Sequence, residues 1–144
     1  MIYTAMTKTA MRIAYNAHKD QVDKTGMPYI FHPFHLAEQM RDEALVCAAL
    51  LHDVVEDTAL TFDDLRQAGI SDEVIVALAL LTHADEVPYL QYVQHIKDSG
   101  NPIAIAVKLA DLQHNADPTR LDEMDDSMLA RCKKYQEAIA LLRR

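Results

Sequence analysis

The densest group of ionisable side chains in the sequence directly follows its most apolar segment. Residues 44–51 (ALVCAALL) are apolar without interruption, and His52 and Asp53 come next. Glu56 and Asp57 follow about one helical turn later. An apolar run of this kind needs a protein interior, and a buried charge needs a partner. Three carboxylates and an imidazole at the end of a buried segment therefore predict a bound cation; the plain alternative is an acidic helix end in solvent.

Other parts of the chain offer further ligands for such a cation. His32 lies upstream, and His35, one helical turn further on, could face the same site. Asp111 lies at the polar end of a second apolar segment, residues 103–110. If the two apolar segments pack together, Asp53 and Asp111 come to one point. The upstream histidine and the second segment favour a metal site over the solvated alternative.

The chemistry of these side chains indicates the kind of ion. Mixed imidazole and carboxylate ligands suit a first-row divalent ion such as Mn²⁺, Fe²⁺ or Zn²⁺. The absence of thiolates from the group disfavours a structural zinc site. A divalent ion acidifies water, and a nearby carboxylate that is not a ligand can take its proton or give one to a leaving group. The pattern therefore indicates metal-dependent hydrolysis.

Helical periodicity and helix-end signals run along the whole chain. The central segment has no polar face and should be buried all round, continuing through residues 52–57 so that the four ionisable groups crowd one helix edge. Read alone, IAIAV at residues 103–107 could be a strand, but its continuation as VKLADLQHN favours a helix. The closing helix should turn Leu129 inward. Helices are expected over residues 3–21, 33–40, 44–57, 61–69, 71–81, 88–99, 102–115 and 128–142.

Length, composition and charge limit the fold and the partners. The 144 residues suit one domain, residues 1–144, and three glycines with five prolines disfavour a turn-rich all-β fold. An all-α bundle of about seven to nine helices is expected. A net charge of −8 argues against nucleic acid or an anionic membrane as partner. With no secretory signal and no apolar run of roughly 18 residues, a cytoplasmic location is expected. The oligomeric state stays open.

Three blocks of the sequence resemble a known enzyme family. The order of His32, the His52-Asp53 pair and Asp111 resembles the metal set of the HD-domain hydrolases. More closely, the chain resembles the hydrolase domain of the RelA/SpoT family and its stand-alone relatives, the small alarmone hydrolases. The blocks that carry this resemblance are AHKDQVDKTGMPYIFHP, AALLHDVVEDT and VKLADLQHN, at residues 17–33, 48–58 and 107–115.

The resemblance implies a fold, a reaction and a set of site residues. The reaction is the manganese-dependent removal of the 3′-pyrophosphate from (p)ppGpp, a small nucleotide substrate. Glu56 and Asp57 match the family's catalytic acid pair, which positions and deprotonates the attacking water. Lys24 and Asn115 match residues that face the nucleotide. The residues that match the metal ligands are His32, His52, Asp53 and Asp111.

Departures from the family pattern bear on the substrate. The family loop usually has Arg-Lys before its glycine, whereas this chain has Asp23-Lys24. The segment after the fifth helix is often basic in the family, but residues 82–98 contain only Lys97 as a basic residue other than histidine. Arg120 comes later in this chain than the arginine that the family often has near this point. The sequence therefore predicts an intact catalytic centre with a weaker clamp for a polyanion.

Two other functions are compatible with the same residues. The first keeps the chemistry and changes the substrate to another nucleotide, for example one with an NADPH-like 2′- or 3′-phosphate. The second is a metal-containing module that binds or senses a nucleotide with little turnover. Glu56 and Asp57 separate hydrolysis from binding, because a pure binder has no chemical need for two extra acids beside the metal. A scaffold without metal would require the four ligands to point apart.

Overall fold

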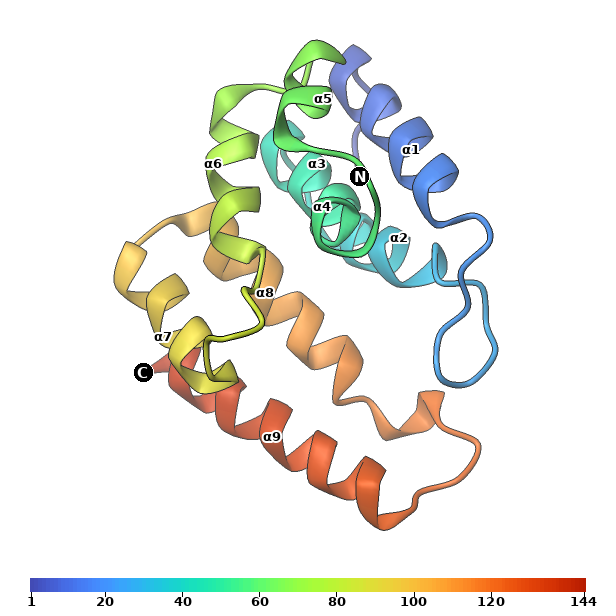
Figure 1. The fold of residues 1–144 in the computed structure, drawn as a ribbon, viewed down its shortest axis with the longest axis vertical. Coiled ribbons are helices and arrows are strands. Elements are labelled where there is room, and N and C mark those ends of the chain that lie inside the picture. Colours follow the sequence, from blue (N-terminus) through green and yellow to red (C-terminus); the bar gives the residue numbers. More distant parts are fainter.

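The computed structural model describes all 144 residues and is all-helical, as the sequence predicts (Figure 1). Apart from the helices, the only regular pairing is a single antiparallel bridge between Val22 and Pro28. The α-helices and the short 3₁₀ helix η1 are α1 (Ala5–His18), α2 (Phe31–Glu38), α3 (Glu43–Leu51), α4 (Val54–Asp57), α5 (Phe62–Gln67), α6 (Asp72–Leu81), α7 (Tyr89–Ser99), α8 (Pro102–Asn115), η1 (Pro118–Arg120) and α9 (Asp126–Arg143).

Helix α3 lies at the centre of the fold. It packs against α1, α2, α6 and α8, and every residue from Val46 to Leu51 is buried. Burial on all sides is what a helix without a polar face requires. The N-terminus of the helix is capped by the side chain of Asp42, which accepts a hydrogen bond from the backbone N–H of Leu45. The central apolar segment therefore forms the predicted buried helix.

The second apolar segment forms helix α8, not a strand. Asn101 caps its N-terminus and Pro102 occupies its first position, where a missing N–H costs nothing. Figure 1 shows α8 crossing the molecule between α3 and α9, and it packs against both. The C-terminal half of α8 carries Asp111 to the end of α3. The two apolar helices thus bring their polar ends together, as their sequences suggest.

The predicted continuous helix through residues 52–57 is wrong. Helix α3 ends at Leu51, Asp53 has φ −108° and ψ 0°, and the four-residue helix α4 starts at Val54. The cause is local: the imidazole Nδ1 of His52 lies 2.7 Å from the carbonyl oxygen of Ala49. That carbonyl would accept the N–H of Asp53 in a continuous helix, so the side chain competes with the backbone.

Other boundaries shift by a few residues. Helix α2 begins at Phe31, so His32 lies inside the helix and not before it. Helix α9 begins at Asp126, and Leu129, predicted to face inward, is 53% exposed, while Ile139 is buried. The capping box of Thr61 with Asp64 forms as its spacing predicts. No helix is long and apolar enough to span a membrane.

Candidate metal centre

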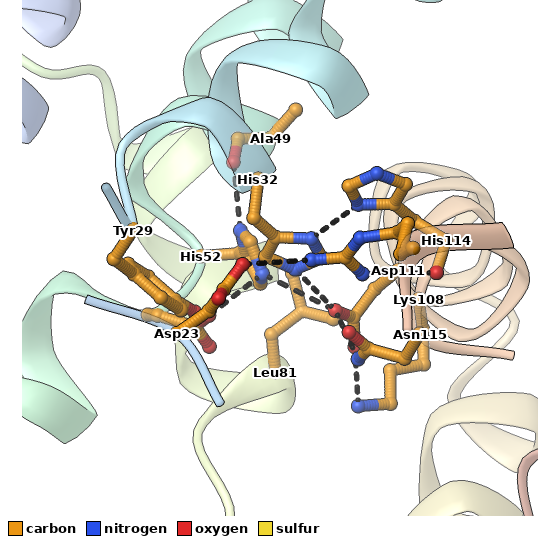
Figure 2. A network of polar contacts seen from close by, with 12 residues as sticks. Asp23, Tyr29, His32, Ala49, His52, Leu81, Lys108, Asp111, His114 and Asn115 are labelled. Atoms are coloured by element: carbon orange, nitrogen blue, oxygen red, sulfur yellow. Dashed lines mark hydrogen bonds and ion pairs between the residues drawn. The ribbon is translucent and has the colours of Figure 1, made fainter. Parts of the chain in front are cut away.

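The four predicted ligands, far apart in the sequence, lie close together: His32, His52 and Asp53 offer ligand atoms within 4.8 Å of one another, and Asp111 lies beside both imidazoles. His32 lies in the first turn of α2, and His52 and Asp53 lie at the junction of α3 and α4. Asp111 comes from α8. Figure 2 shows His32 and Asp111 in contact, with 2.8 Å between His32 Nε2 and Asp111 Oδ1. His52 Nε2 is 2.9 Å from Asp53 Oδ2 and 3.5 Å from Asp111 Oδ1.

The surroundings of His52 suit a divalent cation. Because Ala49 O can only accept, the ring proton of His52 lies on Nδ1, and Nε2 faces the carboxylates. Nε2 is buried and no partner is aligned for a hydrogen bond, although Asp53 and Asp111 are close. Burial lowers the pKa of His52, but these carboxylates outweigh it and raise the pKa well above its usual value. A positive charge is therefore favoured here, and a metal ion or a proton can supply it.

The second predicted ligand carboxylate, Asp111, is held by a buried ion pair. Lys108 Nζ lies 2.9 Å from Asp111 Oδ2, and Asn115 Nδ2 donates to Asp111 Oδ1 at 3.1 Å. Burial raises the pKa of Asp111, but Lys108, His32 and His52 together outweigh it and hold the pKa well below its usual value. Lys108 also lies over the rings of Tyr89 and Tyr92. Asp111 is therefore ionised and fixed, with Oδ1 turned toward the imidazoles.

The first predicted ligand carboxylate, Asp53, accepts a hydrogen bond from the phenol of Tyr29. Burial raises the pKa of Asp53, but His52 and the hydrogen bond from Tyr29 together outweigh it and keep the pKa below its ordinary value. Burial and Asp53 together raise the pKa of Tyr29, so the phenol stays protonated and donates. Tyr29 was not among the predicted site residues, although it lies within the first family block.

The two predicted catalytic acids, Glu56 and Asp57, stand beside the centre on α4. One carboxylate oxygen from each lies within 4.8 Å of one from Asp53. Burial and the charge of Asp53 raise the pKa of both acids above its ordinary value. The backbone N–H of His83 donates to Glu56 Oε1 at 2.6 Å and fixes that side chain. Each acid is therefore a better proton acceptor than a carboxylate in water.

A cavity of about 630 Å³ opens beside the centre. Both nucleotide-facing candidates of the sequence, Lys24 and Asn115, line it, as do His32, Asp53, Glu56, Asp57 and Asp111. Three more cations, Lys108, Arg120 and Arg131, line it together with Tyr89 and Tyr135, and the lining contains six carboxylates beside its four cations. Burial lowers the pKa of Lys24, and the charges of Arg131 and Lys134 lower it further.

The sequence predicts few cations around the site from the segments near the motifs. That prediction does not include cations from elements that lie far away in the sequence. Arg131 comes from α9, and its place in the cavity depends on how α9 packs against α7 and α8. No local sequence signal marks such a residue. Lys108 could have been found, because it lies three residues before Asp111 on one helix and such spacing favours an ion pair.

Asp23, the acid that replaces an arginine of the family pattern, organises its own loop. Its Oδ1 accepts hydrogen bonds from the N–H and hydroxyl of Thr25, at 2.8 and 2.7 Å, and from the N–H of Met27, at 3.1 Å. Its Oδ2 lies 3.5 Å from Arg120 Nη2, and Arg120 Nη1 donates to His114 O at 2.9 Å. Asp23 therefore ties the loop to the end of α8 (Figure 2).

Two other histidines lie near the centre without joining the predicted ligand set. His35 is exposed and its ring lies 4.1 Å from that of His114, so it does not face the ion site. His18 is buried, with Nδ1 2.8 Å from Gln21 Oε1. Neither of these histidines therefore joins the four predicted ligands.

The protein is all-helical. A cluster made of one histidine, a His-Asp pair and a second aspartate lies next to a pair of acids. The model of the HD domain family matches residues 10–104, and the chain belongs to this family. A solved structure of a metazoan orthologue of SpoT that hydrolyses ppGpp shares the fold, with a TM-score of 0.77 and 22% identity over 99% of this chain and 88% of that one. The predicted all-α fold class is confirmed.

The chain is also similar to segments of much longer alarmone enzymes. It is 35% identical over 117 residues to the GTP pyrophosphokinase of Streptomyces coelicolor, covering 74% of this chain and 14% of that protein. It is 32% identical over 119 residues to the probable guanosine-3′,5′-bis(diphosphate) 3′-pyrophosphohydrolase of Synechocystis, covering 74% and 16%. A 64-residue match to the bifunctional (p)ppGpp synthase/hydrolase SpoT of Escherichia coli has 44% identity, covering 42% and 9%. The predicted resemblance to RelA/SpoT proteins is confirmed, and the chain spans less than a fifth of these relatives.

Proposed function

We propose that this protein is a metal-dependent pyrophosphohydrolase that releases pyrophosphate from the 3′ position of (p)ppGpp. The observation that carries this proposal is the acid pair on α4, which stands beside Asp53 of the predicted ligand set and lines a cavity that four cationic side chains also line. The similarity of the chain to (p)ppGpp enzymes supports this choice of substrate. We also propose that residues 1–144 form one domain, since one cluster of buried side chains runs from Ala10 to Leu142.

The four clustered side chains would hold the ion. His32 and His52 would offer Nε2, and Asp53 and Asp111 one oxygen each. Neutral imidazoles with carboxylates suit Mn²⁺, and Fe²⁺ or Zn²⁺ are compatible with the same donors. When bound, the ion supplies positive charge that acidifies water and stabilises the charge that develops on phosphate oxygens.

The acid pair handles protons. Glu56, fixed by the N–H of His83, and Asp57 orient a water molecule and take its proton as the oxygen attacks the phosphorus nearest O3′. The new P–O bond forms as the P–O3′ bond breaks, and the electron pair of that bond goes to O3′, which takes up a proton. The products are pyrophosphate and GDP or GTP.

The cavity offers cationic side chains to the phosphates of a nucleotide. Lys24, Lys108, Arg120 and Arg131 lie around a space of about 630 Å³, which is within the usual range for small-molecule sites. Tyr89 and Tyr135 add aromatic surface to the lining, with Lys108 and Lys134 over the ring of Tyr89 and Lys134 over that of Tyr135. Asn115 lines the cavity and offers both a donor and an acceptor for a nucleotide edge.

The test of this function identifies the product. The metal-stripped protein is given Mn²⁺ and then ppGpp, and pyrophosphate and GDP are measured. We expect both products in equal amounts, and none without metal. Release of single phosphates, or no reaction with ppGpp, would contradict the proposal.

One observation favours a second substrate class with the same chemistry. Asp23 puts a carboxylate at the cavity wall where the family pattern has an arginine, and the carboxylate already binds Arg120. A nucleotide with fewer phosphates, such as one with an NADPH-like 2′-phosphate, would tolerate this acid better than a tetraphosphate. The same assay with NADPH, in which phosphate is measured, compares the two substrates by kcat/KM.

A further inference from the structure

The buried ring of His32 has a polar partner outside the ligand set. Its Nε2 faces Asp111, and its Nδ1 lies 2.7 Å from Nδ1 of His114 (Figure 2). His114 follows Asp111 by three residues on α8, so the two side chains leave the helix on one side. One face of α8 therefore contacts both edges of the His32 imidazole.

The contact between the two rings has the geometry of a directional hydrogen bond. The planes of His32 and His114 are parallel to within 6°, and their centroids are 5.0 Å apart. That separation is too long for face-to-face stacking at van der Waals contact, and it matches two coplanar rings that meet edge to edge through their Nδ1 atoms. The lone pair of one ring thus points along the N–H of the other.

Proton counting assigns the donor. Two imidazole nitrogens at 2.7 Å can share one proton, so one ring donates and the other accepts. A metal ion at the proposed centre needs the lone pair of His32 Nε2, which leaves the ring proton of His32 on Nδ1. His114 must then accept through Nδ1 and carry its own proton on Nε2.

The other proposed histidine ligand shows the same arrangement with a simpler acceptor. The Nδ1–H of His52 donates to the backbone carbonyl of Ala49, which can only accept. Ligand histidines almost always donate their second N–H to a fixed acceptor, which sets the tautomer and the ring orientation. His32 has no carbonyl there, and the imidazole of His114 takes that place.

We propose that His114 is the positioning residue that sets the tautomer of His32 for metal binding. This inference rests on the proposed metal-dependent function. His114 is suited to the task because it is fixed on two further sides. The ring of His35 lies against the ring of His114 at a centroid distance of 4.1 Å, and the backbone carbonyl of His114 accepts a hydrogen bond from Arg120.

Two substitutions at the same position separate the acceptor from the ring. His114→Phe keeps an aromatic ring and removes the acceptor, so the N–H of His32 either stays unpaired or moves to Nε2 and blocks the ion. His114→Asn keeps an acceptor oxygen near the position of Nδ1. The control His35→Phe removes the neighbouring imidazole and leaves the His32–His114 bond intact.

The readout is the affinity for Mn²⁺, measured by calorimetry on folded protein checked by thermal melting. We expect His114→Phe to bind Mn²⁺ about 10- to 100-fold more weakly than the wild type, the usual effect of losing such a partner. His114→Asn and His35→Phe should stay within a few-fold of the wild type. In the Zn²⁺-loaded wild type, ¹⁵N NMR should find the proton of His32 on Nδ1.

The outcomes separate this inference from the function on which it rests. If the wild type binds Mn²⁺ and hydrolyses ppGpp while His114→Phe keeps full affinity, this inference alone is overturned. Equal losses in His114→Phe and His114→Asn would also overturn it, since the acceptor would then not matter. A wild type that binds no divalent ion would overturn the proposed function and this inference together.

Discussion

At the scale of single residues, environment separates carboxylates of the same chemical type into two roles. Asp111 is paired with a lysine and Asp53 with His52, and both have lowered pKa values, which suits permanently ionised ligands. Glu56 and Asp57 have raised pKa values because burial and Asp53 oppose their charge. Groups whose pKa values are pushed in opposite directions are the usual sign of divided acid-base roles.

Replacing Glu56 by glutamine should separate proton transfer from metal binding. The amide keeps the size of the side chain and can still contact His83, but it cannot take a proton. We expect Glu56→Gln to bind Mn²⁺ as the wild type does and to lose 10²- to 10⁴-fold in kcat, the range for a lost general base. The control Glu38→Gln changes an exposed glutamate on α2 and should leave both measurements unchanged. Loss of metal together with turnover would instead make Glu56 a ligand.

The raised pKa values of Glu56 and Asp57 predict that the rate of hydrolysis falls at low pH. A base works only when ionised, and a group with a raised pKa takes up its proton at a higher pH than usual. With saturating Mn²⁺, kcat/KM should therefore fall as the pH drops through a value above 4.5, the ordinary pKa of a glutamate. A profile that stays flat down to pH 4.5 would contradict the assignment of Glu56 and Asp57 as bases.

Lys108 should matter for stability when no metal is present. Lys108→Met leaves the buried carboxylate of Asp111 without its partner cation, and breaking a buried pair costs about 3–5 kcal/mol. Denaturant unfolding in EDTA should show this loss, and added Mn²⁺ should restore part of it by supplying positive charge. Lys133→Met, at an exposed position of α9, is the matched control. A loss as small as that of the control would show that Asp111 does not depend on Lys108.

At the scale of elements, helices α3 and α8 could be predicted from the sequence, but the break between α3 and α4 could not. Helices α3 and α8 follow from long apolar runs with clear caps, so their existence and the meeting of their polar ends follow from the sequence. The break after Leu51 depends on one contact between the imidazole of His52 and the carbonyl of Ala49. The helical pattern of residues 52–57 gives no sign of this contact between a side chain and the backbone.

The cap of α8 gives a prediction at this scale. The side chain of Asn101 accepts from the N–H of Ala104 at 3.0 Å, and losing such a cap costs about 1 kcal/mol. Asn101→Ala should lower the free energy of unfolding by about this amount, without changing the affinity for Mn²⁺, because the cap lies two turns or more from Asp111. Asn16→Ala, at an exposed position inside α1, should be neutral or slightly stabilising. Equal effects of both substitutions would contradict the capping role.

At the scale of the whole molecule, the fold brings four cations and six carboxylates together around one cavity. The net charge is −8, yet Lys24, Lys108, Arg120 and Arg131 line one space beside the proposed centre. The weak clamp stays a prediction, since Lys108 is already paired with Asp111 and Arg120 with Asp23. Arg131 reaches the cavity through the packing of α9, which no local pattern reports.

The central claim is that one bound divalent ion at the cluster of His32, His52, Asp53 and Asp111 is required for pyrophosphate release from ppGpp. The most direct measurement titrates metal-stripped protein with Mn²⁺ while following bound metal and turnover in the same samples. We expect turnover to rise in step with the ion and to saturate at one ion per chain, and we expect Asp53→Asn to lose both together. Turnover in the stripped protein, or full activity in Asp53→Asn, would contradict the claim.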